Sequence, residues 1–204
     1  MLDFSAALQH QLQVEQPTKI DEIPDKQIDI LLFKTSFERQ FSILCTAGLS
    51  NYAMTNNTKE NNHEYIELCF ALPSYWDLTF QSESASWVVE KLMFLSNYVI
   101  NKNTYFWDGH SIPNKNPNAP FSSTMQQSYL FFSHALLNPD KLTSVQVNDK
   151  IIHLLFLIPI FQNELDRKIS RGPNSLKKKM FAAQVGEIID DFRTPVVKKL
   201  FGFF

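Results

Sequence analysis

The feature that most constrains the fold is the longest apolar run in the chain, from Ile151 to Phe161. His153 and Pro159 interrupt this run, and it is well short of the ~20 apolar residues that a helix needs to cross a bilayer. The pair Asn148-Asp149 comes just before it and suits the positive φ angles of a tight hairpin turn. We therefore expect residues 150–161 to form a strand that pairs through this turn with residues 142–147.

Further strands are expected where short apolar or alternating segments end at turn residues. One face of residues 64–72, from Ile66 to Leu72, is purely apolar and should meet the core. The other predicted strands are residues 28–34, 39–46 and 128–137.

Two substantial helices are also expected. Residues 84–101 carry a wide apolar face at helical spacing. Residues 174–192 carry an apolar stripe, with Lys177–Lys179 on the solvent side. Because the strands come in antiparallel-style pairs, with helices between and after them, the predicted fold class is α+β. We expect a mixed, largely antiparallel sheet of about five to seven strands flanked by helices.

The N-terminal residues are expected to be an appendage to one domain. Apolar side chains recur every four positions in residues 1–16, which predicts a short helix. Pro17 and Pro24 then bracket a linker. The expected division is a helix and linker over residues 1–24 and a single domain over residues 25–204, which includes the C-terminal helix.

Composition limits the classes of partner. The formal net charge is −2 and the sequence pI is about 6.2, without the basic excess of a nucleic-acid binder. Only 5 of the 204 residues are glycine, which argues against glycine-rich phosphate loops, and we expect no cofactor. Cys45 and Cys69 lie in apolar, strand-like segments and should be buried free thiols in a reducing compartment. The first four residues lack the features of a signal peptide. A cytoplasmic protein that binds neither nucleic acid nor membrane is predicted.

The connection over residues 101–124 holds the most suggestive polar side chains. Asp108 and His110 stand beside Trp107, as they would in an active site. However, the chain has no Gly-x-Ser-x-Gly motif, and its five histidines are far apart and lack the spacing of metal ligands. We expect Trp107 and Phe121 to hold this loop, which would then present Asp108, His110 and Asn114. Chemistry, partner binding and a purely structural turn remain open.

Two further charged motifs lie near the C-terminus. Glu164 and Asp166 stand at the expected start of a helix, where carboxylates favour the helix dipole and can cap it. Contact with a partner is the main alternative, ahead of acid–base catalysis. For Lys177–Lys179 the alternatives are a solvated helix face and contact with an acidic partner.

Several short motifs follow one another in a recognisable order and spacing. They are Thr46–Ser50 with Met54, Glu64–Leu68, Leu72-Pro73 with Trp76, Gly109–Asn114 with Pro120-Phe121, Phe156–Phe161, and Glu164–Lys168 with Gly172. In this order they resemble the Suppressor of fused domain family in its compact, single-domain bacterial form. The resemblance covers roughly residues 25–180.

The resemblance implies an α+β domain without known catalysis. The animal member is a cytoplasmic regulator of Hedgehog signalling that holds a transcription factor, and this chain is too short to include its second domain. Bacterial members resemble immunity proteins, or antitoxins, which neutralise a cognate toxin by binding it. No catalytic residue is available for transfer from the family.

Three functional hypotheses follow. The first is an immunity protein that binds a toxin encoded by a neighbouring gene. The second is a regulatory or scaffold protein that sequesters a signalling or transcription factor. The third is a hydrolase that uses His110 with Asp108 or Asp166. No metal site is expected, and the oligomeric state is left open. The expected partner-binding residues are Trp107, Asp108, His110, Asn114, Glu164 and Asp166.

Overall fold

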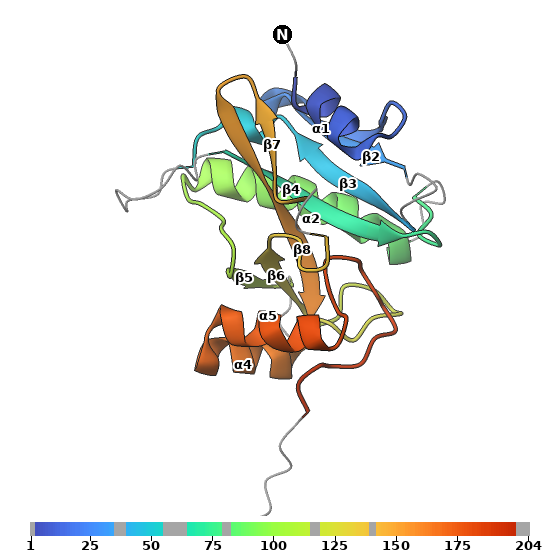
Figure 1. Cartoon of the computed structure of the whole chain (residues 1–204), viewed down its shortest axis with the longest axis vertical. Helices are drawn as coiled ribbons and strands as arrows, with labels where there is room; N and C mark the ends of the chain where they lie inside the picture. Colours follow the sequence, from blue (N-terminus) through green and yellow to red (C-terminus); the bar gives the residue numbers. More distant parts are fainter. Residues whose placement is uncertain are drawn as a thin grey trace, which may run out of the picture.

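The computed structural model describes residues 3–34, 40–54, 65–78, 83–114, 119–138 and 142–198. Within these residues, eight strands form one sheet in the order β1-β2-β3-β4-β8-β6-β5, and β7 pairs with β8 outside this path (Figure 1). The strands are β1 (Thr18–Ile23), β2 (Ile28–Phe33), β3 (Phe41–Ala47), β4 (Ile66–Pro73), β5 (Ser111–Pro113), β6 (Tyr129–Ser133), β7 (Ser144–Val147) and β8 (Lys150–Ile160). The helices are α1 (Phe4–Leu12), α2 (Glu83–Asn101), α4 (Gln162–Arg171) and α5 (Pro173–Ala182), with short 3-10 turns η1 (Pro24–Lys26) and η2 (Leu49–Asn51).

Strand β8 is the centre of the sheet. It runs parallel to β4 and antiparallel to both β6 and β7. The β7–β8 pairing places Val147 opposite Lys150, so the hairpin turns at Asn148-Asp149, as predicted. Asn148 has a φ of 52°, the left-handed conformation that this turn requires. The α+β class with a mixed, largely antiparallel sheet is confirmed, and the sheet is one strand larger than the upper end of the expected range.

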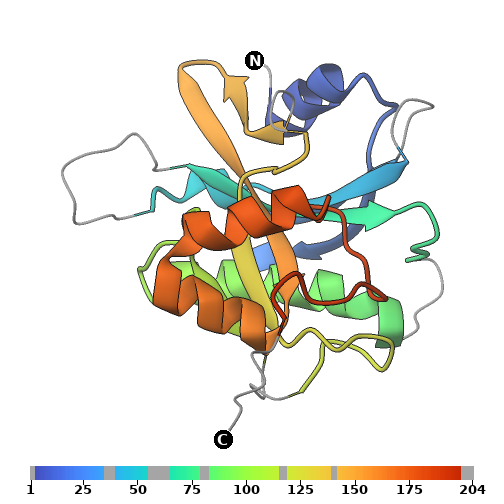
Figure 2. The same ribbon diagram turned by 60° about the horizontal axis from the view of Figure 1, so that its bottom comes forward.

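Both faces of strand β4 are buried. Alternate residues of β4 from Ile66 to Leu72 meet α2, while Cys69 and Ala71 belong to a second core that includes α1 and α5. The apolar face predicted for this strand is therefore correct, and its other face is covered as well. Figure 1 shows α1 at one end of the molecule and α4 and α5 at the other, and Figure 2 shows these two helices side by side. No helix in the described ranges combines the length and apolar character needed to cross a membrane.

The linker predicted between Pro17 and Pro24 is wrong. Residues Thr18–Ile23 form β1, which pairs antiparallel with β2. This strand lies at the edge of the sheet and most of its side chains are exposed, so it lacks the apolar pattern that marks a buried strand. Helix α1 also packs into the main core, with Leu8 fully buried.

The last helix is shorter than predicted. Helix α5 ends at Ala182, and Gln184 adopts a left-handed φ of 54° that turns the chain away. Ile188 then forms a parallel bridge with Ala71 of β4, while Phe192 is 74% exposed. The apolar residues beyond position 182 continue the helical spacing only by coincidence. Some of them, such as Ile188, lie in an extended segment instead.

Gly48 closes the turn between β3 and η2, and we predict that Gly48→Ala is destabilising. Its φ of +119° disfavours any side chain, and a Cβ would lie 2.4 Å from the carbonyl oxygen of Gln27. The strained conformation alone should cost about 1–3 kcal/mol, and the clash adds to this. Urea denaturation measures the effect. Gly172→Ala is the control, because Gly172 has a φ of +80° but open space at its Cβ. An equal loss in both variants would contradict the steric argument.

Candidate functional site

Residues Trp107–Asn114 pack against the α4–α5 helical hairpin, and we call this composite surface the loop–hairpin face. The Lys177 ammonium on α5 contacts both carboxylate oxygens of Asp108. The Lys168 Nζ on α4 donates to the Ser111 hydroxyl at 3.0 Å. These two contacts join segments 57–69 residues apart in sequence into one surface.

Asp108 has a structural role on this face. Besides its ion pair with Lys177, it accepts a hydrogen bond of 3.2 Å from the backbone N–H of His134. The expectation that Lys177–Lys179 all face solvent is therefore wrong for Lys177, whose side chain is only 18% exposed. The partly buried carboxylate attracts this lysine inward, while Lys178 and Lys179 are exposed.

His110 is half-buried in a tight turn. Its backbone N–H donates to the Trp107 carbonyl at 3.0 Å, and its Nδ1 accepts from the Trp107 N–H at 3.3 Å. Burial and the nearby Lys168 ammonium lower the pKa of His110 from 6.5, while Asp108 opposes the shift. The ring is therefore mainly neutral at pH 7, with its proton on Nε2. Among the described residues, no hydrogen bond joins His110 to the carboxylates that the hydrolase hypothesis requires.

The rest of the connection is held by aromatic and amide side chains. The Trp107 ring lies edge-on to the rings of His134 and His153. The Phe121 ring stacks on the Trp87 ring, with 4.8 Å between the ring centroids. Both Trp107 and Phe121 therefore pack as expected. The Asn114 amide donates to the carbonyls of Ala119 and Pro120, at 3.3 and 3.1 Å. Residues 115–118, which connect them, lie outside the described structure. One part of the connection was mispredicted, because residues 111–113 form β5 and pair with β6.

Glu164 is completely buried, and its hydrogen bonds give it a structural role. Its carboxylate accepts from the N–H of Phe161 at 3.0 Å and of Val196 at 2.8 Å. It also accepts two hydrogen bonds of 2.7 Å from the Arg193 guanidinium. Glu164 thus caps α4, as the capping alternative required, and fixes the C-terminal segment. Asp166, by contrast, is exposed and accepts from the Gln162 amide at 2.8 Å.

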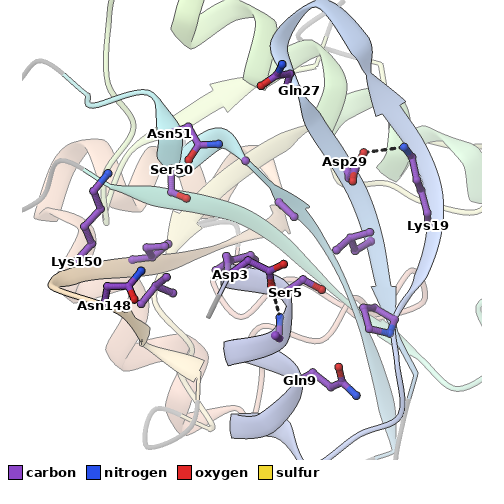
Figure 3. A pocket seen from close by; sticks show the side chains of 18 of the residues that line it. Asp3, Ser5, Gln9, Lys19, Gln27, Asp29, Ser50, Asn51, Asn148 and Lys150 are labelled. Atoms are coloured by element: carbon purple, nitrogen blue, oxygen red, sulfur yellow. Dashed lines mark hydrogen bonds and ion pairs between the residues drawn. The ribbon is translucent and has the colours of Figure 1, made fainter. Parts of the chain in front are cut away.

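A concavity of about 950 Å³ lies at the opposite end of the molecule, beside α1. Figure 3 shows polar side chains around it from α1, the turn before β2 and the β7–β8 turn, including Gln9, Gln27 and Asn148. Its apolar lining includes Leu31 and Ile152, which are almost fully buried. No local sequence pattern indicates this concavity, because residues from many separate segments meet there only in the folded chain.

Glu67 supports one wall of this concavity from inside the core. It accepts from the N–H groups of Gly48 and Ser50, each at 3.0 Å, and from the Ser50 hydroxyl at 2.7 Å. The Thr46 hydroxyl donates to its other oxygen. Burial raises the pKa of Glu67, and these hydrogen bonds oppose the shift. The carboxylate therefore organises the turn that carries Gly48 and Ser50.

The described residues contain no group of three or more histidine, cysteine or acidic side chains placed to hold a metal ion. Cys45 and Cys69 are free, buried and opposite each other on β3 and β4. Burial raises the pKa of the Cys45 thiol well above its ordinary value. A thiol with a raised pKa is a poor nucleophile at pH 7.

Comparison with known proteins places this architecture in a family. Residues 24–194 match the sequence profile of the Suppressor of fused protein (SUFU) family. This chain belongs to the Suppressor of fused family. No curated protein sequence is significantly similar to it.

Solved structures have the same fold at low sequence identity. A SUFU homologue from Neisseria gonorrhoeae is 14% identical, with a TM-score of 0.67 over 96% of this chain and 98% of that one. The structure of a Sufu–Fu complex matches at 16% identity and a TM-score of 0.55, over 83% of this chain and 76% of that one. Drosophila Suppressor of fused matches at 15% identity and a TM-score of 0.53, over 83% of this chain but only 42% of that one.

The motifs that carried the family resemblance now have definite places in this Suppressor of fused domain. Thr46–Ser50 surrounds the buried Glu67 carboxylate. Gly109–Asn114 lies on the loop–hairpin face, and Glu164–Lys168 forms the start of α4 on the same face. Two motifs that are distant in the sequence thus build one surface.

Proposed function

We propose that this Suppressor of fused domain is a non-catalytic protein-binding module that acts in the cytoplasm as an immunity protein. It would neutralise a toxin encoded by a neighbouring gene by covering the toxin's functional surface. The observation that carries the proposal is the composite loop–hairpin face. There the Asp108–Lys177 ion pair and the Lys168–Ser111 hydrogen bond hold the loop against two helices. Such preorganised surfaces bind partners with little loss of conformational entropy.

The side chains on this face have the mixture found in protein interfaces. Ile169 of α4 and Phe181 of α5 are 71% and 56% exposed and supply apolar contact area. Asp166 is exposed, and His110 is partly exposed in the loop. The proposed contact or supporting residues are Trp107, Asp108, His110, Asn114 and Asp166, with Glu164 acting from the interior.

A second candidate function is sequestration of a signalling or transcription factor. The matched Sufu–Fu complex supports it, because that relative was solved together with a protein partner. The two candidates share the binding chemistry and differ in the identity of the partner. A toxin from the adjacent gene supports the first, and a signalling or DNA-binding protein supports the second.

We expect the purified chain to bind the product of the adjacent toxin gene and to protect cells that express it. Ile169→Asp should weaken binding by about tenfold or more, because a charge would replace an exposed apolar contact. Isothermal titration calorimetry measures this effect. The matched control is Ile151→Asp, since Ile151 is 45% exposed at the start of β8 and outside the loop–hairpin face.

His110→Ala separates binding from hydrolysis, because a binding protein should lose protection only as far as it loses affinity for the toxin, whereas a hydrolase that uses His110 should lose protection while toxin binding is kept. A chain that neither bound the toxin nor protected cells would refute the immunity role. If Ile151→Asp weakened binding while Ile169→Asp did not, the interface would lie away from the loop–hairpin face.

A further inference from the structure

The α4–α5 hairpin of the loop–hairpin face is strongly basic in an acidic protein. Residues 162–182 contain six arginines and lysines against two carboxylates, a formal charge of +4 in a chain whose net charge is −2. The remainder of the chain therefore carries −6. Charge separation of this size favours association with a partner of opposite charge at the basic end.

Lys168 stands out among these cations. Its ammonium donates to the neutral hydroxyl of Ser111, and burial lowers the pKa of Lys168 from 10.5. Within the described structure, Lys168 forms no ion pair, whereas the neighbouring Lys177 is paired with Asp108. A partly desolvated ammonium with only a neutral acceptor can still gain a charge-assisted hydrogen bond from an incoming carboxylate.

From this arrangement we propose that the loop–hairpin face recognises an acidic protein surface, and that Lys168 and Ser111 together receive one of its carboxylates. The inference rests on the proposed protein-binding function and specifies the chemistry of the partner. Ser111 is well placed for this role, since it belongs to β5 and its hydroxyl already lies within hydrogen-bond distance of the ammonium.

Other side chains of the hairpin favour a protein over a nucleic acid. Arg171, Lys178 and Lys179 are exposed and extend the positive field around Lys168. The exposed Ile169 and Phe181 lie on the same two helices, and a phosphate backbone would leave such apolar side chains unused. An acidic protein surface with an apolar centre satisfies both kinds of group.

A direct test uses a fluorescent octaglutamate peptide as the probe, with binding followed by anisotropy at low ionic strength. Lys168→Glu should weaken binding by about tenfold or more, because it reverses the charge at the central contact. Lys34→Glu is the matched control, since Lys34 is exposed and belongs to neither the loop nor the hairpin, and it should change binding by less than about threefold. Ser111→Ala keeps the charge and should give a smaller loss than Lys168→Glu.

Specificity is tested with two other polyanions. Single-stranded octadeoxynucleotide and vesicles containing phosphatidylglycerol should bind more weakly than octaglutamate, and tighter binding of either would overturn the proposal. Lys178→Glu is a second variant that separates the loss of charge from unfolding. Lys178 is exposed, so the substitution should leave the fold intact and should also weaken binding. Equal affinities of Lys168→Glu, Lys178→Glu and Lys34→Glu would likewise overturn it.

Failure of this inference can be told apart from failure of the proposed function. If the adjacent-gene toxin binds the native chain and Lys168→Glu with equal affinity, the acidic-surface inference is refuted while protein binding stands. If the toxin does not bind but octaglutamate binds through Lys168, the immunity role fails and the surface chemistry stands.

Discussion

An Arg193→Ala variant is expected to lose about 3–5 kcal/mol of unfolding free energy, the usual cost of leaving a buried charge without its partner. The Glu164 carboxylate is completely buried, and the Arg193 side chain is only 7% exposed. Arg193 also donates to the Pro159 carbonyl at 2.7 Å and covers the Phe161 ring. The substitution therefore removes the link between β8, the start of α4 and the C-terminal segment.

Urea denaturation with a double-mutant cycle isolates the pair. Glu164→Ala and the Glu164→Ala/Arg193→Ala double variant complete the cycle, and the double variant should be less destabilised than the sum of the two single ones. Arg171→Ala is the control, because Arg171 is exposed at the end of α4. A loss below about 1 kcal/mol for Arg193→Ala, as expected for a surface ion pair, would contradict the structure.

The elements that could be predicted are those defined by their own apolar pattern. Residues 66–73 and 150–160 become strands because their side chains must enter cores on the two faces of the sheet. The wide apolar face of residues 84–101 likewise predicts α2. By contrast, β1 is defined by hydrogen bonds to β2 and has exposed side chains, so local composition gives no indication of it.

The candidate site was predictable only in pieces. Asp108 and His110 were noticed as chemical groups, but their surroundings depend on Lys168 and Lys177, about sixty residues later in the chain. The burial of Glu164 depends on Arg193, which no local pattern connects to it. A single sequence shows which side chains are charged, whereas tertiary packing decides which of these charges become paired.

Buried carboxylates perform a common task in this glycine-poor chain. Glu67, Glu164 and Glu187 have no solvent exposure, and each accepts hydrogen bonds from backbone N–H groups of a turn or helix start. Glu187, for example, accepts from the N–H groups of Leu136 and Leu137. Turn segments with buried N–H groups need such acceptors, since an unsatisfied buried donor costs about 1–3 kcal/mol. Acidic residues are therefore part of the internal framework of this fold.

Glu67→Leu should be as damaging as the loss of Arg193, with an expected cost of about 3–5 kcal/mol, because several buried donors would lose their acceptor at once. These donors are the N–H groups of Gly48 and Ser50 and the hydroxyls of Ser50 and Thr46. Glu67→Gln keeps the shape and one carbonyl acceptor, so it should cost less. Denaturant unfolding at pH 7 provides the comparison, and a leucine variant as stable as the glutamine variant would contradict this role.

The pH dependence of stability in the native chain and in Glu67→Gln tests whether burial or hydrogen bonding determines the pKa of the Glu67 carboxyl group. Burial raises the pKa of Glu67 above its ordinary value of 4.5, so the folded chain holds this proton more tightly than the unfolded chain. The stabilisation is complete below the ordinary pKa and is lost as pH rises through the raised one. The stability of the native chain relative to Glu67→Gln should therefore decrease over this interval. An increase would mean that the hydrogen bonds from Thr46 and Ser50 outweigh burial and favour the ionised form.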